Sequence, residues 1–199
     1  QQISCTKKNE GFKTAGQVQY VAQTGNFVEK GFAYTGALDI LKVALSYDYL
    51  WINLRVKGGA YGCMSGFKRN GESFLVSYRD PHLKRTLEVY QGVPDYIRAF
   101  EADEREMTKY IIGTISNKDV PRTPQMQGSI SKTAYFSNVT EDMLQKERNQ
   151  ILGAQKEDIQ KLAALVEAVL SDDQICVVGS ETAIEKAEDV FMEVKPLIG

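Results

Sequence analysis

Near the N-terminus, apolar and polar residues alternate over a short stretch, a pattern typical of a strand that buries one face. The stretch is Gln17–Ala22, with Val18, Tyr20 and Ala22 at every second position. Successive side chains of a strand point to opposite faces of its sheet. The pattern therefore predicts a strand with these three apolar side chains in the core.

From Ala37 to Lys57 the chain contains neither proline nor glycine and has the periodicity of a long helix. Its apolar residues recur at spacings of three and four, which places one series along a single side: Leu38, Leu41, Leu45, Tyr49, Ile52 and Val56. Arg55 lies in the expected last turn, where a cation favours the helix dipole. Gly58-Gly59 follows as a stop signal, so we expect one continuous helix that ends there.

Two extended stretches follow, at 60–67 and 72–78, separated by Lys68-Arg69-Asn70-Gly71. Asn-Gly between extended stretches is a strong hairpin signal, because a type I′ turn needs two residues with positive φ. The second stretch alternates, which places three apolar side chains on one face: Phe74, Val76 and Tyr78.

The rest of the chain is mostly helical in pattern. Helices are predicted over 83–100 with a break at Pro94, over 104–116, over 126–136, after Thr140, over 156–170 and after Ser180, with a buried strand at 174–179. Strands are few and helices come in runs. This order predicts an α+β fold, a two-layer sandwich in which helices cover one face of a mostly antiparallel sheet. We expect residues 1–199 to form a single domain.

Composition limits the kind of protein. Apolar residues make up 43% of the 199 positions and the net charge is −2, which favours a folded chain and argues against a nucleic-acid partner. The most apolar helical stretch, 162–170, is short and contains Glu167, so we expect no membrane contact. Three distant cysteines do not suggest a secreted disulfide framework, which favours a reducing compartment such as the cytoplasm. The chain begins at Gln1 rather than methionine, and we expect it to be a piece of a longer protein.

Few residues could carry chemistry alone. His82 is the only histidine and follows Asp80-Pro81, where a turn position is the ordinary role and a catalytic or ligand role the rarer one. A zinc site would have to combine it with three distant cysteines, Cys5, Cys63 and Cys176. Structural zinc sites normally use closely spaced ligand pairs, and no inverted His-x-x-Glu-His motif is present. We therefore expect this chain to bind no metal.

The segment Gly58-Gly59-Ala60-Tyr61-Gly62 is rich in glycine but does not have the spacing of a phosphate-binding loop. It also follows a helix C-terminus, whose negative dipole repels phosphate. Two interpretations of its neighbours are open. Arg55 and Tyr61 are either a dipole partner and a core aromatic, or groups that face one cavity. In the second case Arg55 could grip a peptide carbonyl and Tyr61 could donate to a developing oxyanion.

The stretch Leu54–Gly62 resembles the arginine–tyrosine segment of the insulinase/pitrilysin family of zinc metallopeptidases, the inverzincins, and is most similar to the presequence-protease subfamily. The resemblance extends over most of the chain, through four further segments: Asn9–Phe12, Val18–Val21, Gly25–Phe27 and Ser77–Pro81.

The resemblance implies a fold and a place in a larger enzyme. Family members contain four related α+β domains of the LuxS/MPP-like type, arranged as two halves around a chamber for short unfolded peptides. Their zinc belongs to the first domain, and the last domain supplies an arginine and a tyrosine. By resemblance, this chain is the C-terminal, fourth domain. Arg55 would hold the substrate backbone, Tyr61 would bond the scissile carbonyl and its oxyanion, and Gly58 and Gly59 would allow the turn between them.

The resemblance also implies partners and rival functions. Activity is expected only in the parent, a zinc metalloendopeptidase that degrades oligopeptides, together with its N-terminal, zinc-bearing half. The family also has zinc-less members, so the alternative is a non-catalytic structural or peptide-binding domain. A free-standing adaptor is a third and weaker hypothesis. A mitochondrial or plastid matrix is the alternative compartment.

Overall fold

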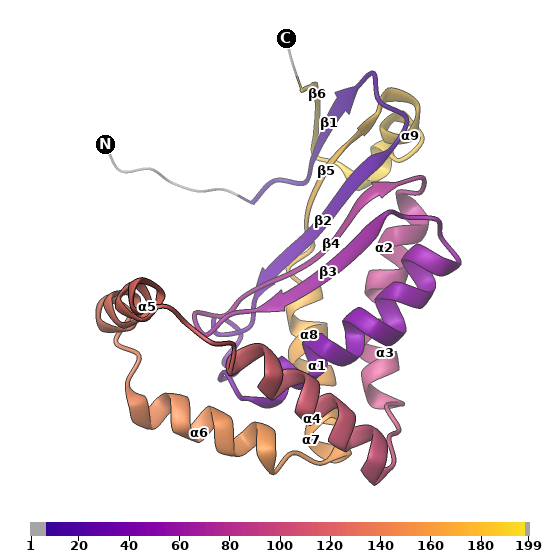
Figure 1. Cartoon of the computed structure of the whole chain (residues 1–199). Coiled ribbons are helices and arrows are strands. Elements are labelled where there is room, and N and C mark those ends of the chain that lie inside the picture. The colour runs from indigo at the N-terminus through magenta and orange to yellow at the C-terminus, as the bar shows by residue number, and fades with distance from the viewer. Residues whose placement is uncertain (1–6, 198–199) are drawn as a thin grey trace.

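The computed structural model describes residues 7–197, which form a six-stranded sheet with helices around it (Figure 1). The strands, in chain order, are β1 (Glu10–Thr14), β2 (Gln19–Asn26), β3 (Gly62–Phe67), β4 (Glu72–Asp80), β5 (Gln174–Ser180) and β6 (Glu193–Pro196). They are arranged as β3-β4-β2-β5-β1-β6. The pairs β3–β4, β4–β2 and β2–β5 are antiparallel, whereas β1 runs parallel to both β5 and β6.

The helical segments of the described residues fill the intervals between these strands. They are α1 (Ala37–Ala44), η1 (Leu45–Tyr49), η2 (Trp51–Val56), α2 (Lys84–Gln91), α3 (Val93–Arg98), α4 (Glu104–Lys118), α5 (Pro124–Phe136), α6 (Glu141–Leu152), α7 (Lys156–Gln160), α8 (Ala163–Leu170), α9 (Glu181–Glu185) and η3 (Glu188–Val190). Within residues 7–197, none of them combines the length and apolarity needed to cross a bilayer.

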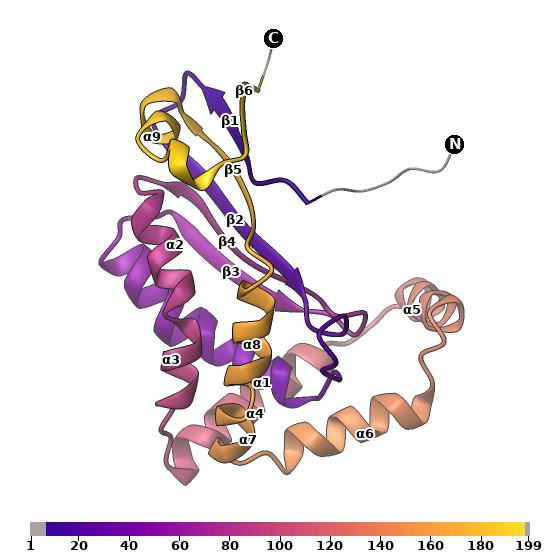
Figure 2. The same cartoon turned by 180° about the vertical axis from the view of Figure 1, so that it is seen from behind.

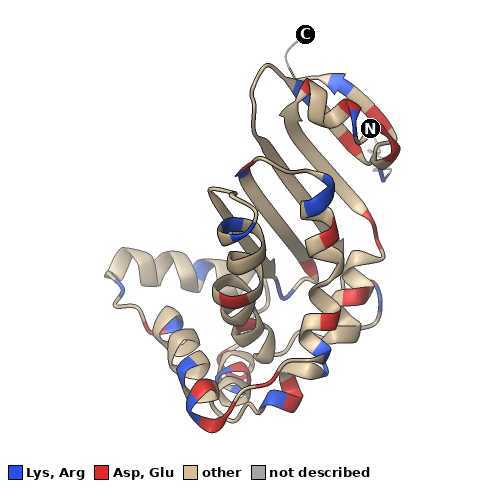
Figure 3. Cartoon of the chain, turned by 90° about the vertical axis from the view of Figure 1, so that its right-hand side faces the viewer, with Lys and Arg blue, Asp and Glu red and all other residues tan. Residues whose placement is uncertain are grey.

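Helices cover one face of the sheet and leave the other open. Figures 1 and 2 show α1, α2, α3 and α8 together on the covered face, whereas α5 lies apart from this layer, beyond the β3–β4 end of the sheet. Basic and acidic residues are interspersed over the helices (Figure 3). The predicted α+β sandwich is confirmed, and its sheet is mixed, with antiparallel pairing on the β3 side.

The core lies between the sheet and the covering helices. From the strands it takes Val21, Leu75 and Val177, all almost completely buried. Two polar side chains here are buried with hydrogen-bond partners: the Gln23 amide donates to the Leu170 carbonyl of α8 at 3.3 Å, and the Tyr90 hydroxyl of α2 donates to the Val21 carbonyl at 3.1 Å. These bonds connect the helical layer to the sheet.

The predicted buried face of the first strand is wrong. In β2 the buried positions are Gln19, Val21 and Gln23, while Tyr20 is 47% exposed. In β4 the apolar series Phe74, Val76 and Tyr78 is likewise the half-exposed one. Alternation identifies a strand with two unlike faces, but it does not say which face the helices cover. Here the more regularly apolar face is the open one.

The long helix is continuous from Ala37 to Val56, but its second half is π-helical. The Lys57 N–H, for example, donates to the Ile52 carbonyl at 2.9 Å, five residues back. The wider turn moves the buried side, so the predicted stripe holds as far as Leu45 and then continues through Leu50 and Leu54. Val56, expected in the core, is 67% exposed.

The predicted hairpin is confirmed, with a different turn from the one expected. Of its loop residues only Gly71 has positive φ, at +89°. The Gly71 N–H donates to the Lys68 carbonyl at 2.9 Å, and the Lys68 N–H donates to the Glu72 carbonyl at 2.8 Å. Since a type I′ turn needs two positive φ values, this loop is instead a turn closed by one left-handed glycine.

Candidate functional site

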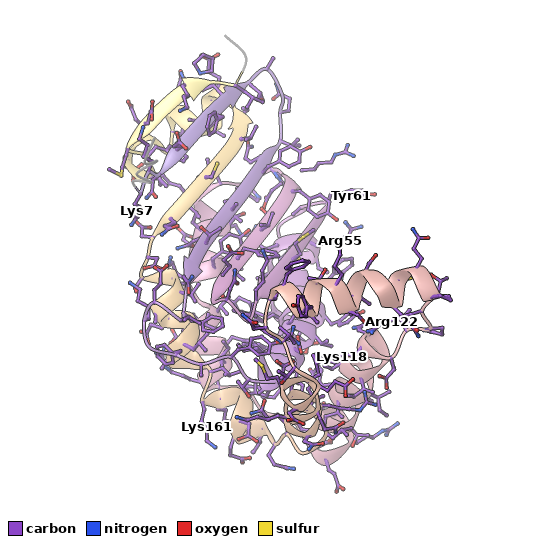
Figure 4. The ribbon with its side chains drawn as sticks, turned by 90° about the vertical axis from the view of Figure 1, so that its left-hand side faces the viewer. Lys7, Arg55, Tyr61, Lys118, Arg122 and Lys161 are labelled. Carbon is purple, nitrogen blue, oxygen red and sulfur yellow. The ribbon has the colours of Figure 1, made fainter. Side chains whose placement is uncertain are left out.

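The residues singled out by the sequence meet at the β3 edge of the sheet. Arg55 lies in the last turn of η2, Gly58 and Gly59 form the following turn, and Tyr61 directly precedes β3. Figure 4, which looks onto the open face, shows the labelled Arg55 and Tyr61 close together at this edge. The local fold therefore places a cation and a phenol side by side at the β3 edge of the sheet.

The two glycines make this turn possible. Gly59 has a φ of +78°, a left-handed conformation that costs other residues about 1–2 kcal/mol. A Cβ on Gly58 would lie 2.4 Å from the Leu54 carbonyl oxygen, which is too close for any side chain. The turn is closed by the Gly59 N–H, which donates to the Arg55 carbonyl at 2.9 Å. Both positions are thus restricted to glycine by geometry.

The Arg55 side chain lies among aromatic rings. Its guanidinium carbon is 4.8 Å from the centroid of Trp51 and 5.5 Å from that of Tyr61, within the range of cation–π attraction. One guanidinium nitrogen donates to the Tyr61 carbonyl. A guanidinium has five N–H donors, so this single bond leaves donors for a further acceptor.

The Tyr61 ring is open to solvent, with 57% of the residue exposed. Its ring centroid lies 5.8 Å from that of Tyr78 and 5.2 Å from the guanidinium carbon of Arg79. The Tyr61 backbone N–H donates to the Arg79 carbonyl at 3.3 Å. Within residues 7–197 the phenol hydroxyl has no hydrogen-bond partner, so it can donate to a ligand.

These side chains line a shallow depression of about 530 Å³. Its lining consists of two arginines with apolar, aromatic and glycine residues: Val18, Trp51, Arg55, Val56, Gly59, Ala60, Tyr61 and Arg79. No acidic residue is part of this lining. The depression therefore combines apolar walls with donors and positive charge.

The other candidates do not join this site as reactive groups. His82 is exposed, and its backbone N–H donates to Asp80 Oδ1 at 2.9 Å, as in an ordinary turn. Burial raises the pKa of the Cys63 thiol to about 11, although the nearby Arg55 opposes the shift. Cys63 is thus protonated at neutral pH and a poor nucleophile. Cys176 is a free, exposed thiol on β5, and Cys5 lies outside the described residues.

The residues present do not fit a zinc ion. Across the part of the chain that the structure describes, no three His, Cys, Asp or Glu side chains are grouped as a metal site requires. Catalytic zinc takes three protein ligands, and residues 7–197 do not offer them.

Two residues that line the depression were missed by sequence reasoning. Trp51 lies four residues before Arg55, a spacing that places both on one side of a helix and could have been noticed. Arg79 comes from β4, and no local pattern connects it with Tyr61.

Comparison with known proteins gives the family. The family described as the PreP C-terminal domain matches residues 9–181. Protein HypA of Clostridium perfringens is 50% identical over 192 residues, which are 96% of this chain and 20% of that protein. Presequence protease 1 of Arabidopsis thaliana, a chloroplastic and mitochondrial protein by name, is 33% identical over 94% of this chain and 18% of its own length. The chain thus spans about a fifth of the length of these relatives.

Solved structures share the fold at low identity. The inactive domain of an M16 peptidase from Pseudomonas fluorescens has a TM-score of 0.58 at 16% identity, over 96% of this chain and 44% of that one. Pitrilysin has a TM-score of 0.55 at 17% identity, over 86% of this chain and 19% of its own. The family match and the relatives in sequence establish that the chain belongs to the PreP C-terminal domain family, and it shares its fold with an M16 peptidase domain and with pitrilysin.

Proposed function

We propose that this chain is the substrate-contacting C-terminal domain of a zinc metalloendopeptidase that degrades oligopeptides. The observation that carries the proposal is the open depression in which Arg55 and Tyr61 keep unused hydrogen-bond donors, in a domain of this family. Arg55 binds a backbone carbonyl of the peptide. Tyr61 donates from its hydroxyl to the scissile carbonyl and to the oxyanion that forms from it.

The physical basis of these roles is charge stabilisation. A donor fixed near the place where negative charge develops lowers the barrier more than it strengthens ground-state binding. The turn through Gly58 and Gly59 fixes Tyr61 relative to Arg55, so little reorganisation is needed during the reaction. Arg55 in turn is held by Trp51 and by the Tyr61 carbonyl.

The zinc belongs to another part of the parent in this proposal, since the described residues offer no ligand set. The relatives are about five times as long as this chain, which leaves room for a metal-bearing half. We place this chain as a single domain, the fourth and last of such a protein. The compartment stays a prediction: a reducing one such as the cytoplasm, or the organelle matrix indicated by the names of several relatives.

The open face of the sheet supports a partner within the same polypeptide. On this face Tyr20 and Met64 are nearly half exposed, and Phe74 and Val76 are only partly covered. Uncovered apolar side chains grouped on one face are typical of an interaction surface. We propose that the N-terminal half, with the bound peptide, faces this side of the domain.

The test is Tyr61→Phe in the full-length protein. Loss of one oxyanion donor is expected to lower kcat by roughly ten- to a thousand-fold with little change in KM. Tyr135→Phe is a matched control, because Tyr135 is also an exposed tyrosine, at 79%, on the distant α5. Equal peptide turnover in the two variants would overturn the role of Tyr61.

The second candidate function is a non-catalytic structural or peptide-binding domain. It is favoured by the same absence of metal ligands within residues 7–197. It predicts that the full-length protein binds peptides or partners without cleaving them, and that its preceding sequence has no inverted zinc motif.

A further inference from the structure

Strand β4 carries one extra residue beside β2. Two residues of β4, Tyr78 and Arg79, face the single β2 residue Tyr20, so the register shifts there. Such a bulge redirects side chains, and bulges are common next to active sites. This one lies beside the depression that contains Arg55 and Tyr61.

Arg79 has an unusual backbone conformation, with a φ of +49°. The other non-glycine residues with positive φ in the described chain are Asn138 and Asp173. Asn and Asp tolerate this conformation, because their short polar side chains bond locally, whereas arginine does not. Glycine would serve the fold better at position 79. Residues held in such a conformation are often functional.

The Arg79 side chain points to the same place as the two proposed site residues. Its guanidinium carbon lies 5.2 Å from the Tyr61 ring centroid, and the Arg55 guanidinium carbon lies 5.5 Å from that ring. Neither arginine forms an ion pair with a carboxylate in residues 7–197. The adjacent Asp80 is buried and already accepts bonds from the His82 N–H at 2.9 Å and the Thr86 hydroxyl at 2.7 Å.

The charges around the depression favour an anionic ligand. It has two guanidinium groups, no acidic residue in its lining, and aromatic rings that lie within cation–π range of these groups. Guanidinium groups bind carboxylates in a fork geometry that a lone carbonyl does not fill.

We propose that Arg79 and Arg55 form a carboxylate-binding subsite beside Tyr61, which binds an acidic side chain or a terminal carboxylate of the peptide. The inference rests on the proposed function, because it assumes that peptides bind at this depression. It adds a substrate-contacting residue, Arg79, and a preference for negative charge close to the peptide group that Tyr61 contacts.

The experiment uses the full-length protein and pairs of labelled peptides that differ only in charge. In the first pair the C-terminus is amidated, and the two peptides differ by Glu or Gln at one position. This position is varied over the two residues on each side of the cleaved bond. In the second pair no acidic side chain is present and the C-terminus is a free acid or an amide. Dissociation constants from fluorescence anisotropy and kcat/KM values are both measured, so the result does not depend on turnover alone.

At one position, or at the free C-terminus, the wild-type protein is expected to prefer the charged peptide by about three- to tenfold. The preference is expected to shrink in higher salt, to disappear in Arg79→Met and to be partly kept in Arg79→Lys. Arg148→Met is the control, because Arg148 pairs with Asp119 far from the site. A wild type without any preference, or an Arg79→Met protein with an unchanged preference, overturns the proposal.

Arg79→Gly separates substrate binding from folding. It relieves the strained backbone, so its melting temperature is expected to equal or exceed that of the wild type while the charge preference is lost. A lower melting temperature with the preference intact would make Arg79 a structural residue and overturn the proposal. Failure of the proposed function would give a different result. Tyr61→Phe would then turn over peptides normally, and the charge preference could still be measured in the wild type.

Discussion

Two pairs of arginines in this domain have opposite surroundings. Arg69 and Arg148 each bind a carboxylate through two nitrogens, with distances of 2.5–2.6 Å to Glu147 and 2.6–2.7 Å to Asp119. Arg55 and Arg79 lie over aromatic rings instead, and within residues 7–197 neither pairs with an acid. The first pair uses its guanidinium donors within the fold, whereas the second pair keeps hydrogen-bond donors free at the depression.

The backbone around Arg148 and the backbone around Arg55 show a similar contrast. Around Arg148 the helices are regular and capped, as by Thr140, whose hydroxyl accepts the Met143 N–H at 3.2 Å. Around Arg55 the helix is π-helical, Gly59 is left-handed and a bulge interrupts β4. Departures from regular geometry cost stability and are frequent at functional sites. The comparison predicts that changes near Arg55 affect turnover and changes near Arg69 affect folding.

The largest effect is expected for Arg55→Met in the full-length protein. Removing the guanidinium should lower kcat/KM by about a hundredfold, because a charge-assisted contact to the peptide is lost. The free energy of unfolding should change by less than about 1 kcal/mol, since Arg55 has no carboxylate partner in the described chain. Steady-state kinetics and urea unfolding measure the two quantities. A stability loss larger than the activity loss would break the comparison.

Arg69→Met is expected to show the reverse. Its partner Glu147 is only 8% exposed, so the change leaves a buried carboxylate without its cation. The loss in unfolding free energy should be about 2 kcal/mol, with peptide turnover of the folded protein nearly unchanged. Arg148→Met is the exposed counterpart and should cost less than about 1 kcal/mol. Equal stability in the two variants would show that burial of Glu147 does not matter.

Gly59→Ala sharpens the comparison at the turn itself. A Cβ there meets only the Pro81 ring at 3.6 Å, so the cost comes from the positive φ and not from a clash. We expect about 1–2 kcal/mol of destabilisation, together with weaker turnover as Tyr61 is displaced. Gly31→Ala is a control, because Gly31 is also left-handed, has nothing near its Cβ and lies far from Arg55 along the chain. Thermal unfolding and kcat should separate the two variants, with activity lost only in Gly59→Ala.

The smallest expected effect is on the pH dependence of stability. Burial alone would raise the pKa of Asp172, but bonds from Lys30 at 2.6 Å and from the Asn26 N–H at 3.0 Å outweigh it and lower the pKa. A carboxyl with a lowered folded pKa stabilises the protein above its unfolded pKa, and this contribution is lost as pH falls through the folded pKa. Asp172→Asn should thus lower stability at pH 7 by less than about 1 kcal/mol and reduce its fall below about pH 4. Urea unfolding at pH 3 and pH 7 measures this difference, and an unchanged pH dependence would exclude the assigned role.

Much of the fold could be predicted because its signals are local. The capping box of Asp103 and Glu106 is present at the start of α4, and Ser180 caps α9 through its bond to the Ala183 N–H. The covered face could not be predicted, since alternation is symmetric with respect to the two faces of a strand. β1 and β6 were missed because they are short and gain their stability from parallel partners distant in sequence.

The site was predictable only in part. Arg55, Tyr61 and the glycines stood out at the helix end, the resemblance to a family suggested their roles, and the structure brings them together while those roles stay proposals. Arg79 was out of reach, because a left-handed arginine at a bulge has no sequence signal of the kind that Asn-Gly provides. The π-helical turn was missed for a similar reason, since a change from four- to five-residue bonding leaves the composition of a helix unchanged.

The central claim is that Arg55 and Tyr61 act as one unit on the bound peptide, Arg55 on a backbone carbonyl and Tyr61 on the scissile carbonyl. A double-mutant cycle with Arg55→Met, Tyr61→Phe and the double variant of the full-length protein, measured as kcat/KM for one peptide, tests it most directly. We predict that the double variant is hardly slower than the worse single variant, because loss of the Arg55 guanidinium also removes the bond that holds the Tyr61 carbonyl and so already impairs Tyr61. Losses that multiply fully in the double variant would show that the two residues act independently and would contradict the account.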